Sequence, residues 1–149
     1  MAAPGETVVS IHVAATRGVA VIPVASVHAM PGRGLEGDRH CGRSGEGRAV
    51  TLIESEAIEA LDRDYEFKLQ PGDARRNIVT RGVALNHLVG REFTVGAVKL
   101  RGVELCEPCG HLAKLTSDIV SRGLVHRGGL RCDILTEGEI RVGDPILVE

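Results

Sequence analysis

The sequence predicts a mainly β domain of the α+β class, a barrel with a few short helices. Short apolar runs that alternate with polar residues recur along the chain of 149 residues. Most of these runs end in Gly, Pro or Asp, which favour turns. The 19 Gly residues are scattered, and the chain shows no internal repeat and no linker. We therefore expect residues 1–149 to form a single domain, long enough to bury a core.

The alternating runs predict the strands in order. In the first, residues 7–16, Val9, Ile11 and Val13 alternate with Val8, Ser10 and His12. The second, 19–28, contains Pro23, which cannot donate a ladder hydrogen bond and so suggests an edge strand or a bulge. Further strands are expected at residues 49–53, 77–80, 92–95, 98–105, 130–135 and 146–148.

The clearest helix is expected at residues 54–65, where apolar residues from Ala57 to Tyr65 fall on one face. Residues 83–88 predict a short helical turn, and residues 109–115 a short helix after Pro108. Turns are expected at 71–73, 137–138 and 143–145. Residues 31–47 predict a loop, and its length suggests a functional role because long structureless loops are uncommon in compact domains.

Composition and charge exclude several classes of protein. Aromatic residues make up 2% of the chain and Trp is absent, which argues against a binder of single-stranded nucleic acid. A net charge of −2 gives no basic field for nucleic acid or an anionic membrane. No apolar run is long enough to span a membrane, and residues 1–7 do not resemble a signal peptide. We expect a cytoplasmic protein whose four Cys are reduced.

The most informative motif is Leu-Cys-Glu-Pro-Cys-Gly-His-Leu at residues 105–112. Cys106 and Cys109 are consistent with half of a zinc site, with a redox pair, with a single reactive thiol, or with two buried apolar residues. A zinc site would need further ligands, for which the candidates are His40, Cys41, His111 and Cys132. The Pro-Cys-Gly setting makes burial less expected for Cys109 than for Cys106.

Three further polar motifs stand at the ends of predicted strands, within residues 34–40, 75–81 and 125–130. Each alone is consistent with a solvated turn or a polar strand entrance. A barrel, however, can gather strand ends at one rim, and this rim would be an anion-binding pocket with a thiol in it. The candidate binding residues are Arg39, His40, Arg76, Asn77, His126 and Arg127.

Together these segments resemble the MOSC domain, the family named for the C-terminal domain of molybdenum cofactor sulfurase. The resemblance runs from Gly34 to Asp144 and rests on the order and spacing of several motifs. These are residues 34–40, 50–54, 71–73, 76–78, 88–91, 106–109, 126–130 and 142–144.

The resemblance implies a MOSC-type β-barrel that handles sulfur or the molybdenum cofactor (molybdopterin). The Cys of the family's Pro-Cys turn corresponds to Cys109, which would carry sulfur as a persulfide or bind molybdenum. The six candidate binding residues would hold the anionic cofactor. The chain shows no cysteine desulfurase domain, so we expect a separate cysteine desulfurase or a cofactor donor as partner.

Two other functions stay open at this point. One is a molybdenum-dependent reductase of N-hydroxylated compounds, which would need an electron-transfer partner. The other is a non-catalytic module stabilised by zinc through Cys106, Cys109 and His111. The protein would therefore be a sulfur transferase, an oxidoreductase or no enzyme. We expect a monomer, or a homodimer formed through an edge strand at residues 19–27.

Overall fold

The computed structural model describes residues 6–15, 21–38, 41, 47, 49–107 and 118–148. Strands dominate this part of the chain. They are β1 (Thr7–Val13), β2 (Ile22–Val24), β3 (Ser26–Met30), β4 (Gly34–Leu35), β5 (Val50–Glu54), β6 (Ile78–Arg81), β7 (Glu92–Val95), β8 (Val98–Leu105), β9 (Leu130–Ile134), β10 (Gly138–Arg141) and β11 (Ile146–Val148). The helices are α1 (Ser55–Tyr65) and α3 (Asp118–Gly123), with 3₁₀ turns η1 (Pro71–Ala74) and η2 (Leu85–Leu88).

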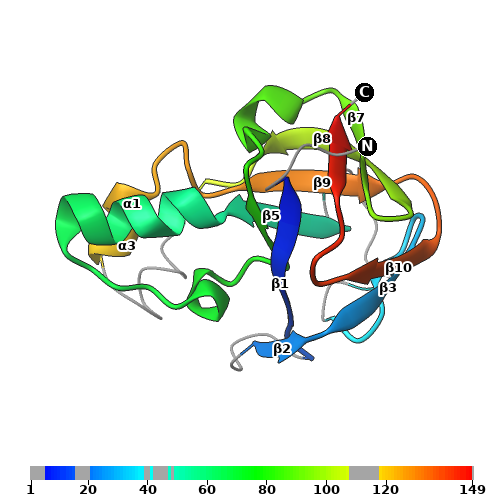
Figure 1. Ribbon diagram of the computed structural model, residues 1–149, viewed down its shortest axis with the longest axis horizontal. Helices are drawn as coiled ribbons and strands as arrows, with labels where there is room; N and C mark the ends of the chain where they lie inside the picture. The colour runs from blue at the N-terminus through cyan, green and yellow to red at the C-terminus, as the bar shows by residue number, and fades with distance from the viewer. Residues whose placement is uncertain are drawn as a thin grey trace.

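Eight strands form one sheet in the order β11-β7-β8-β9-β5-β6-β1-β2. The sheet curls until β11 meets β1, as the red and blue strands in Figure 1 show. The Val8 N–H donates to the Asp144 carbonyl (2.9 Å), and the Ile146 N–H donates to the Glu6 carbonyl (2.9 Å). A second sheet, β10-β3-β4, adds Val27, Leu35 and Ile140 to the same core. The mainly β, barrel-like fold is thus confirmed.

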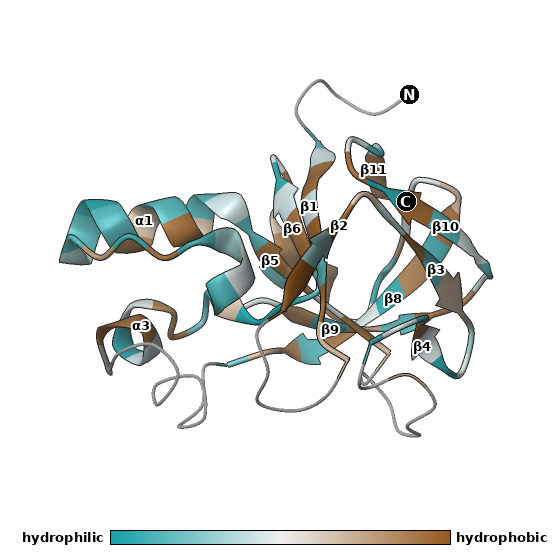
Figure 2. Cartoon of the chain, turned by 90° about the horizontal axis from the view of Figure 1, so that it is seen from below, coloured by the Kyte–Doolittle hydropathy of each residue, from teal (hydrophilic) through white to brown (hydrophobic). Residues whose placement is uncertain are grey.

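Strands β5 and β6 are buried on both faces because two cores lie on either side of them. Leu52 and Ile78, which pair across the two parallel strands, point into the main core inside the curled sheet. Their neighbours Ile53 and Val79 point the other way, into a second core beneath α1 and α3. Figure 2 shows these helices standing at one side of the barrel. No helix in the described ranges is both long and apolar enough to cross a membrane.

Most predicted elements are found near their predicted places. The segment 19–28 differs, because the chain bends at Ala25 and splits into β2 and β3, which belong to different sheets. Pro23 lies in β2 at the edge of the large sheet, as predicted. The predicted loop at 31–47 contains the two-residue strand β4, and the predicted turn at 71–73 is part of η1. The predicted helix at 109–115 lies outside the described residues.

Three elements, β4, β10 and α3, were not predicted, and in β1 the buried and exposed side chains do not follow the predicted alternation. Strand β10 stands where only a turn was expected, and α3 was missed. In β1 the predicted alternation fails because the register shifts between Val8 and Ser10, a β-bulge. The bulge places Val8 on the core face together with Ile11 and Val13, while Val9 is exposed. His12, on the opposite face of the strand, is buried against Gly72.

Candidate functional site

Arg76 lies between η1 and β6 and is buried, with its guanidinium spread over three backbone carbonyls. Its Nε donates to the Gly128 carbonyl (2.7 Å), Nη2 to the Cys106 carbonyl (3.2 Å) and Nη1 to the Ala74 carbonyl (3.4 Å). These bonds use three of the five N–H groups of the guanidinium. Arg76 therefore ties the end of β8 to the loop before β9, two segments far apart in sequence.

Asn77, the next residue, joins three neighbouring strands with its side-chain amide. Its Oδ1 accepts hydrogen bonds from the Thr51 N–H (3.1 Å) and the Thr51 hydroxyl (3.2 Å). Its Nδ2 donates to the His12 carbonyl (3.2 Å). Because Thr51 belongs to β5 and His12 to β1, Asn77 fixes both strands at the start of β6. Both ends of the amide are engaged within the protein.

The two glycines after Arg127 have different structural roles. Gly128 provides the carbonyl that Arg76 holds most closely. Gly129 has φ = 118°, and a Cβ atom there would stand 2.1 Å from the Leu52 carbonyl oxygen. Its own carbonyl accepts a hydrogen bond from the Cys106 N–H (2.7 Å). Only glycine combines this backbone conformation with so close an approach to β5.

Glu107 forms a two-point contact with His126. Glu107 Oε1 accepts from the His126 backbone N–H (2.6 Å), and Oε2 lies 2.7 Å from Nδ1 of the imidazole. His126 has φ = 61°, and its carbonyl accepts from Asn86 Nδ2 (2.7 Å). The His126 side chain is 75% exposed. The His126 backbone N–H, and then its imidazole, hold the pKa of the Glu107 carboxyl below its usual value.

Arg127 is exposed and follows His126 directly. Its backbone N–H donates to the Leu124 carbonyl (2.8 Å), which ends the turn after α3. Burial raises the pKa of the Glu54 carboxyl at the end of β5, and the charge of Arg127 opposes this effect. His126 and Arg127 thus present two basic side chains to solvent, and the His126 imidazole contacts Glu107.

His12 is a buried polar residue that the sequence did not single out. Its Nε2 lies 2.9 Å from the Ser10 hydroxyl, while Nδ1 is buried and has no hydrogen-bond partner in the described part of the chain. Burial lowers the pKa of His12, against the opposing charge of Asp73. A Cβ atom on Gly72 would stand 3.2 Å from Nδ1. The only sequence signal was a His within an apolar strand.

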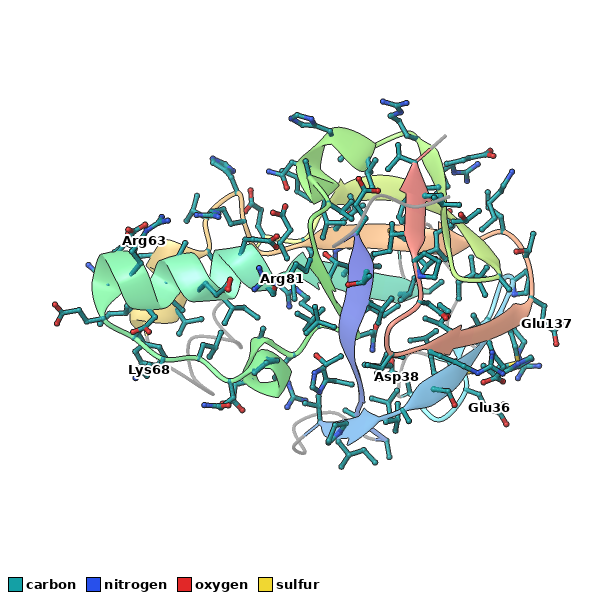
Figure 3. All side chains as sticks on the ribbon, in the orientation of Figure 1. Glu36, Asp38, Arg63, Lys68, Arg81 and Glu137 are labelled. Atoms are coloured by element: carbon teal, nitrogen blue, oxygen red, sulfur yellow. The ribbon has the colours of Figure 1, made fainter. Side chains whose placement is uncertain are left out.

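The motif at 34–40 is described only as far as Asp38, whose buried carboxylate accepts a hydrogen bond from the Ala14 N–H (3.1 Å). In Figure 3 the label of Asp38 lies near the lower end of β1. Asp38 therefore holds the chain that continues β1. Arg39 and His40 lie outside the described residues, so their predicted roles as ligands stay predictions.

The cysteines fall into different surroundings. Cys106 is 4% exposed, and Cys132 is buried in the main core, where burial raises the pKa of its thiol. Cys41, Cys106 and Cys132 are free thiols. Cys109 and His111, on which the catalytic and zinc predictions depend, lie outside the described residues. Within the described ranges, no group of three or more His, Cys, Asp or Glu is placed to hold a metal ion.

The structure thus brings two of the predicted binding residues, Arg76 and His126, into contact with the segment 106–107. Arg76 and Asn77 engage backbone groups inside the protein, while His126 and Arg127 face solvent. The sequence did not indicate that Glu107 anchors His126, or that His12 is a buried polar residue. The predicted contacts of these residues with a cofactor stay predictions.

Comparison with known families decides the relationship. The model of the MOSC domain matches residues 36–147. This chain belongs to the MOSC domain family. No curated protein sequence matches it.

Solved structures share the MOSC fold. The YuaD protein from Bacillus subtilis is 15% identical, with a TM-score of 0.84 over 95% of this chain and 93% of that protein. YiiM from Geobacillus stearothermophilus is 20% identical, with a TM-score of 0.75 over 96% of this chain and 74% of the other. YiiM from Escherichia coli is 18% identical, with a TM-score of 0.68 over 95% and 69%. At these identities the likeness concerns the fold alone.

Proposed function

We propose that this MOSC domain handles the molybdenum cofactor or sulfur, with Cys109 as the thiol that binds molybdenum or carries a persulfide. Family membership supports the proposal. The observation that carries it is the anchoring of the segment 106–107, which leads directly into Pro108 and Cys109. The backbone of Cys106 is held by Gly129 and Arg76, and the carboxylate of Glu107 is held twice by His126. Such anchoring suits a turn that must present a reactive group in one position.

The described residues fit an anionic cofactor. His126, which contacts Glu107, and the next residue Arg127 are exposed basic side chains, and guanidinium and imidazolium groups suit phosphate oxygens. Arg76 keeps two N–H groups beyond the three that hold carbonyls. When bound, the cofactor would supply a soft metal that accepts a thiolate ligand. Cys106 is buried, which leaves Cys109 as the thiol of the motif for this role.

The sulfur-carrying form of the proposal needs a donor. The thiolate of Cys109 would attack the outer sulfur of a persulfide on a separate cysteine desulfurase. A new S–S bond forms on Cys109, the S–S bond of the donor breaks, and the donor thiol leaves as its thiolate. The basic groups of His126 and Arg127 would favour the thiolate form of a nearby Cys.

The test is anaerobic gel filtration of the protein mixed with released molybdenum cofactor, reading molybdenum in the protein peak. We expect co-elution with the wild type and with the Cys41→Ser control, and its loss in Cys109→Ser. Molybdenum that co-elutes equally with Cys109→Ser would contradict the role of this thiol. If no molybdenum co-elutes with the wild type, mass spectrometry for a persulfide on Cys109 tests the sulfur-carrying form alone.

Two other functions can be tested with the same protein preparations. Stoichiometric zinc in protein purified without chelator would replace the proposal with a zinc-stabilised module through Cys106, Cys109 and His111. If the cofactor binds, reduction of an N-hydroxylated purine by a cell extract, with and without the protein, tests the molybdenum-dependent reductase. An unchanged rate would count against that activity and would leave cofactor handling as the function.

A further inference from the structure

A pocket of about 230 Å³ contains neither Arg76 nor His126 in its lining, although its lining residue His87 follows Asn86, which binds the His126 carbonyl. Segments from three places in the sequence meet there: Glu6 just before β1, residues 82–91, and Val148 in β11. Its lining residues are Glu6, Gly82, Val83, Ala84, His87, Leu88, Arg91 and Val148. The volume is below the range typical of pockets for drug-sized ligands, so a small metabolite would fit it.

The floor of the pocket is apolar. Val83 and Leu88 are buried beneath it and belong to the main core. Val148, in β11, also lines the pocket and is 44% exposed. A branched aliphatic group placed against Val83, Leu88 and Val148 would remove apolar surface from water.

The rest of the lining carries charges of both signs. Glu6 supplies a carboxylate, while Arg91 and His87 supply a guanidinium and an imidazole. Arg91 already interacts with another part of the protein, but its fork of five N–H groups can hold a carboxylate as well. Opposite charges around apolar residues complement a molecule that carries both an ammonium and a carboxylate group together with an apolar side chain.

The walls of the pocket are held by backbone hydrogen bonds. The Gly82 N–H donates to the Glu56 carboxylate (2.8 Å), and the Arg91 N–H donates to the Leu88 carbonyl (3.0 Å). The Glu6 carbonyl accepts from Ile146 (2.9 Å). A pocket whose backbone is fixed in this way loses little conformational freedom when a ligand enters.

We propose that this pocket binds a free α-amino acid with a branched apolar side chain, with leucine as the representative. The ligand carboxylate pairs with Arg91, its ammonium group pairs with Glu6, and its side chain packs on Val83 and Val148. This site is separate from the cofactor or sulfur function proposed above.

The test is a ¹H–¹⁵N NMR titration of the full chain with leucine, with 4-methylpentanoate, which lacks the amine, and with isopentylamine, which lacks the carboxylate. We expect saturable shifts of the Val83 and Val148 amides with leucine. Each truncated ligand should bind about tenfold more weakly, since it loses one charged contact. Arg91→Gln and Glu6→Gln should each weaken leucine binding about tenfold for the same reason.

Arg81→Gln is the matched control, because Arg81 ends β6 beside the pocket but pairs with Glu59. It should bind leucine as the wild type does, and so should Cys109→Ser, which separates this site from the proposed function. The proposal fails if millimolar leucine produces no saturable shift in the wild type. It also fails if 4-methylpentanoate binds as tightly as leucine, or if the shifts gather at Glu107 and His126 instead.

Discussion

Arg76 and His126 hold the same short segment, residues 106–107, in opposite surroundings. The Arg76 guanidinium is buried and binds backbone carbonyls, including that of Cys106. The His126 ring is largely exposed and binds the Glu107 carboxylate. Carbonyls that lose Arg76 would be left without a partner away from water, whereas the exposed pair can exchange its contacts with water. We infer that the first contact maintains the fold and that the second serves the function proposed for the motif at residues 105–112.

The strongest test of the buried side is Gly129→Ala. A Cβ atom would collide with the Leu52 carbonyl at 2.1 Å and would be attached to a backbone with φ = 118°. We expect a loss of roughly 4 kcal/mol or more in the free energy of unfolding, measured in urea. Gly37→Ala is the control, since Gly37 has φ = 87° but no atom within 4 Å of a Cβ. It should lose only about 1 kcal/mol, from backbone strain alone. Equal losses in the two variants would show that contact with β5 is unimportant.

Arg76→Met should have the next largest effect. The change keeps the aliphatic part of the side chain but leaves the carbonyls of Cys106 and Gly128 without their donor. We expect a loss of about 3 kcal/mol in urea denaturation. Arg81→Met removes an exposed Arg whose partner is Glu59, and it should change stability little. If Arg76→Met and Arg81→Met lose the same free energy of unfolding, the burial of Arg76 does not make its contacts more stabilising than those of Arg81.

Two histidines sharpen the comparison through pH. Burial lowers the pKa of His12, so the unfolded chain binds a proton that the folded chain resists. The protein therefore becomes less stable as pH falls below 6.5, the ordinary pKa of His. His12→Gln should reduce this loss of stability. Hydrogen bonds to Glu137, and then to Glu139, raise the pKa of the more exposed His28. Its stabilising effect is present at pH below 6.5 and is lost as pH rises, so His28→Gln should increase the loss on acidification.

The measurement is urea unfolding at about pH 7.5 and about pH 5.5, which lie on either side of the ordinary His pKa. The difference between the two stabilities should shrink in His12→Gln and grow in His28→Gln. The same direction of change in both variants would contradict the assigned surroundings of one histidine.

Glu107→Gln should have the smallest effect on stability. His126 lowers the pKa of the Glu107 carboxyl, so this group stabilises the fold above pH 4.5 and loses its effect as pH falls through its folded pKa. Because the pair is exposed, the expected loss at neutral pH is below about 1 kcal/mol. Cofactor binding, measured by gel filtration, should nevertheless fall, because the contact between Glu107 and His126 serves the proposed function. Unchanged binding would remove Glu107 from the proposed function.

Elements specified by local patterns could be predicted from the sequence. Strands β7, β8 and β11 have the predicted bounds, because alternating residues are bordered by Gly or Pro. Helix α3 could not be predicted, since Ile119, Val120 and Gly123 are poor helix formers. Val120 is buried in the second core beneath α1, so packing overrides the local preference.

The sequence predicted which residues belong to the candidate site better than it predicted what those residues contact. The sequence singled out Arg76 and Asn77 as polar residues before a strand, and nothing local shows whether such groups reach a ligand or a carbonyl. The partner of Arg76 Nε, Gly128, stands 52 residues away in the chain. The bulge in β1, which brings Val8 into the same core as Ile11, likewise depends on the pairing of β1 with β6. These contacts depend on segments that are distant in the sequence, so local sequence patterns could not predict them.

The meeting of β1 with the residues around β11 has a consequence for how the protein is made. The Val8 backbone is bonded to Gly143 and Asp144, so the first strand finds its last partners near the end of the chain. A ribosome adds residues in order, and β1 must wait for these partners until almost the whole chain has emerged. Contacts so distant in sequence slow folding and expose strand edges in the meantime. We expect the last step of barrel closure to wait until residues 143–144 have left the ribosome.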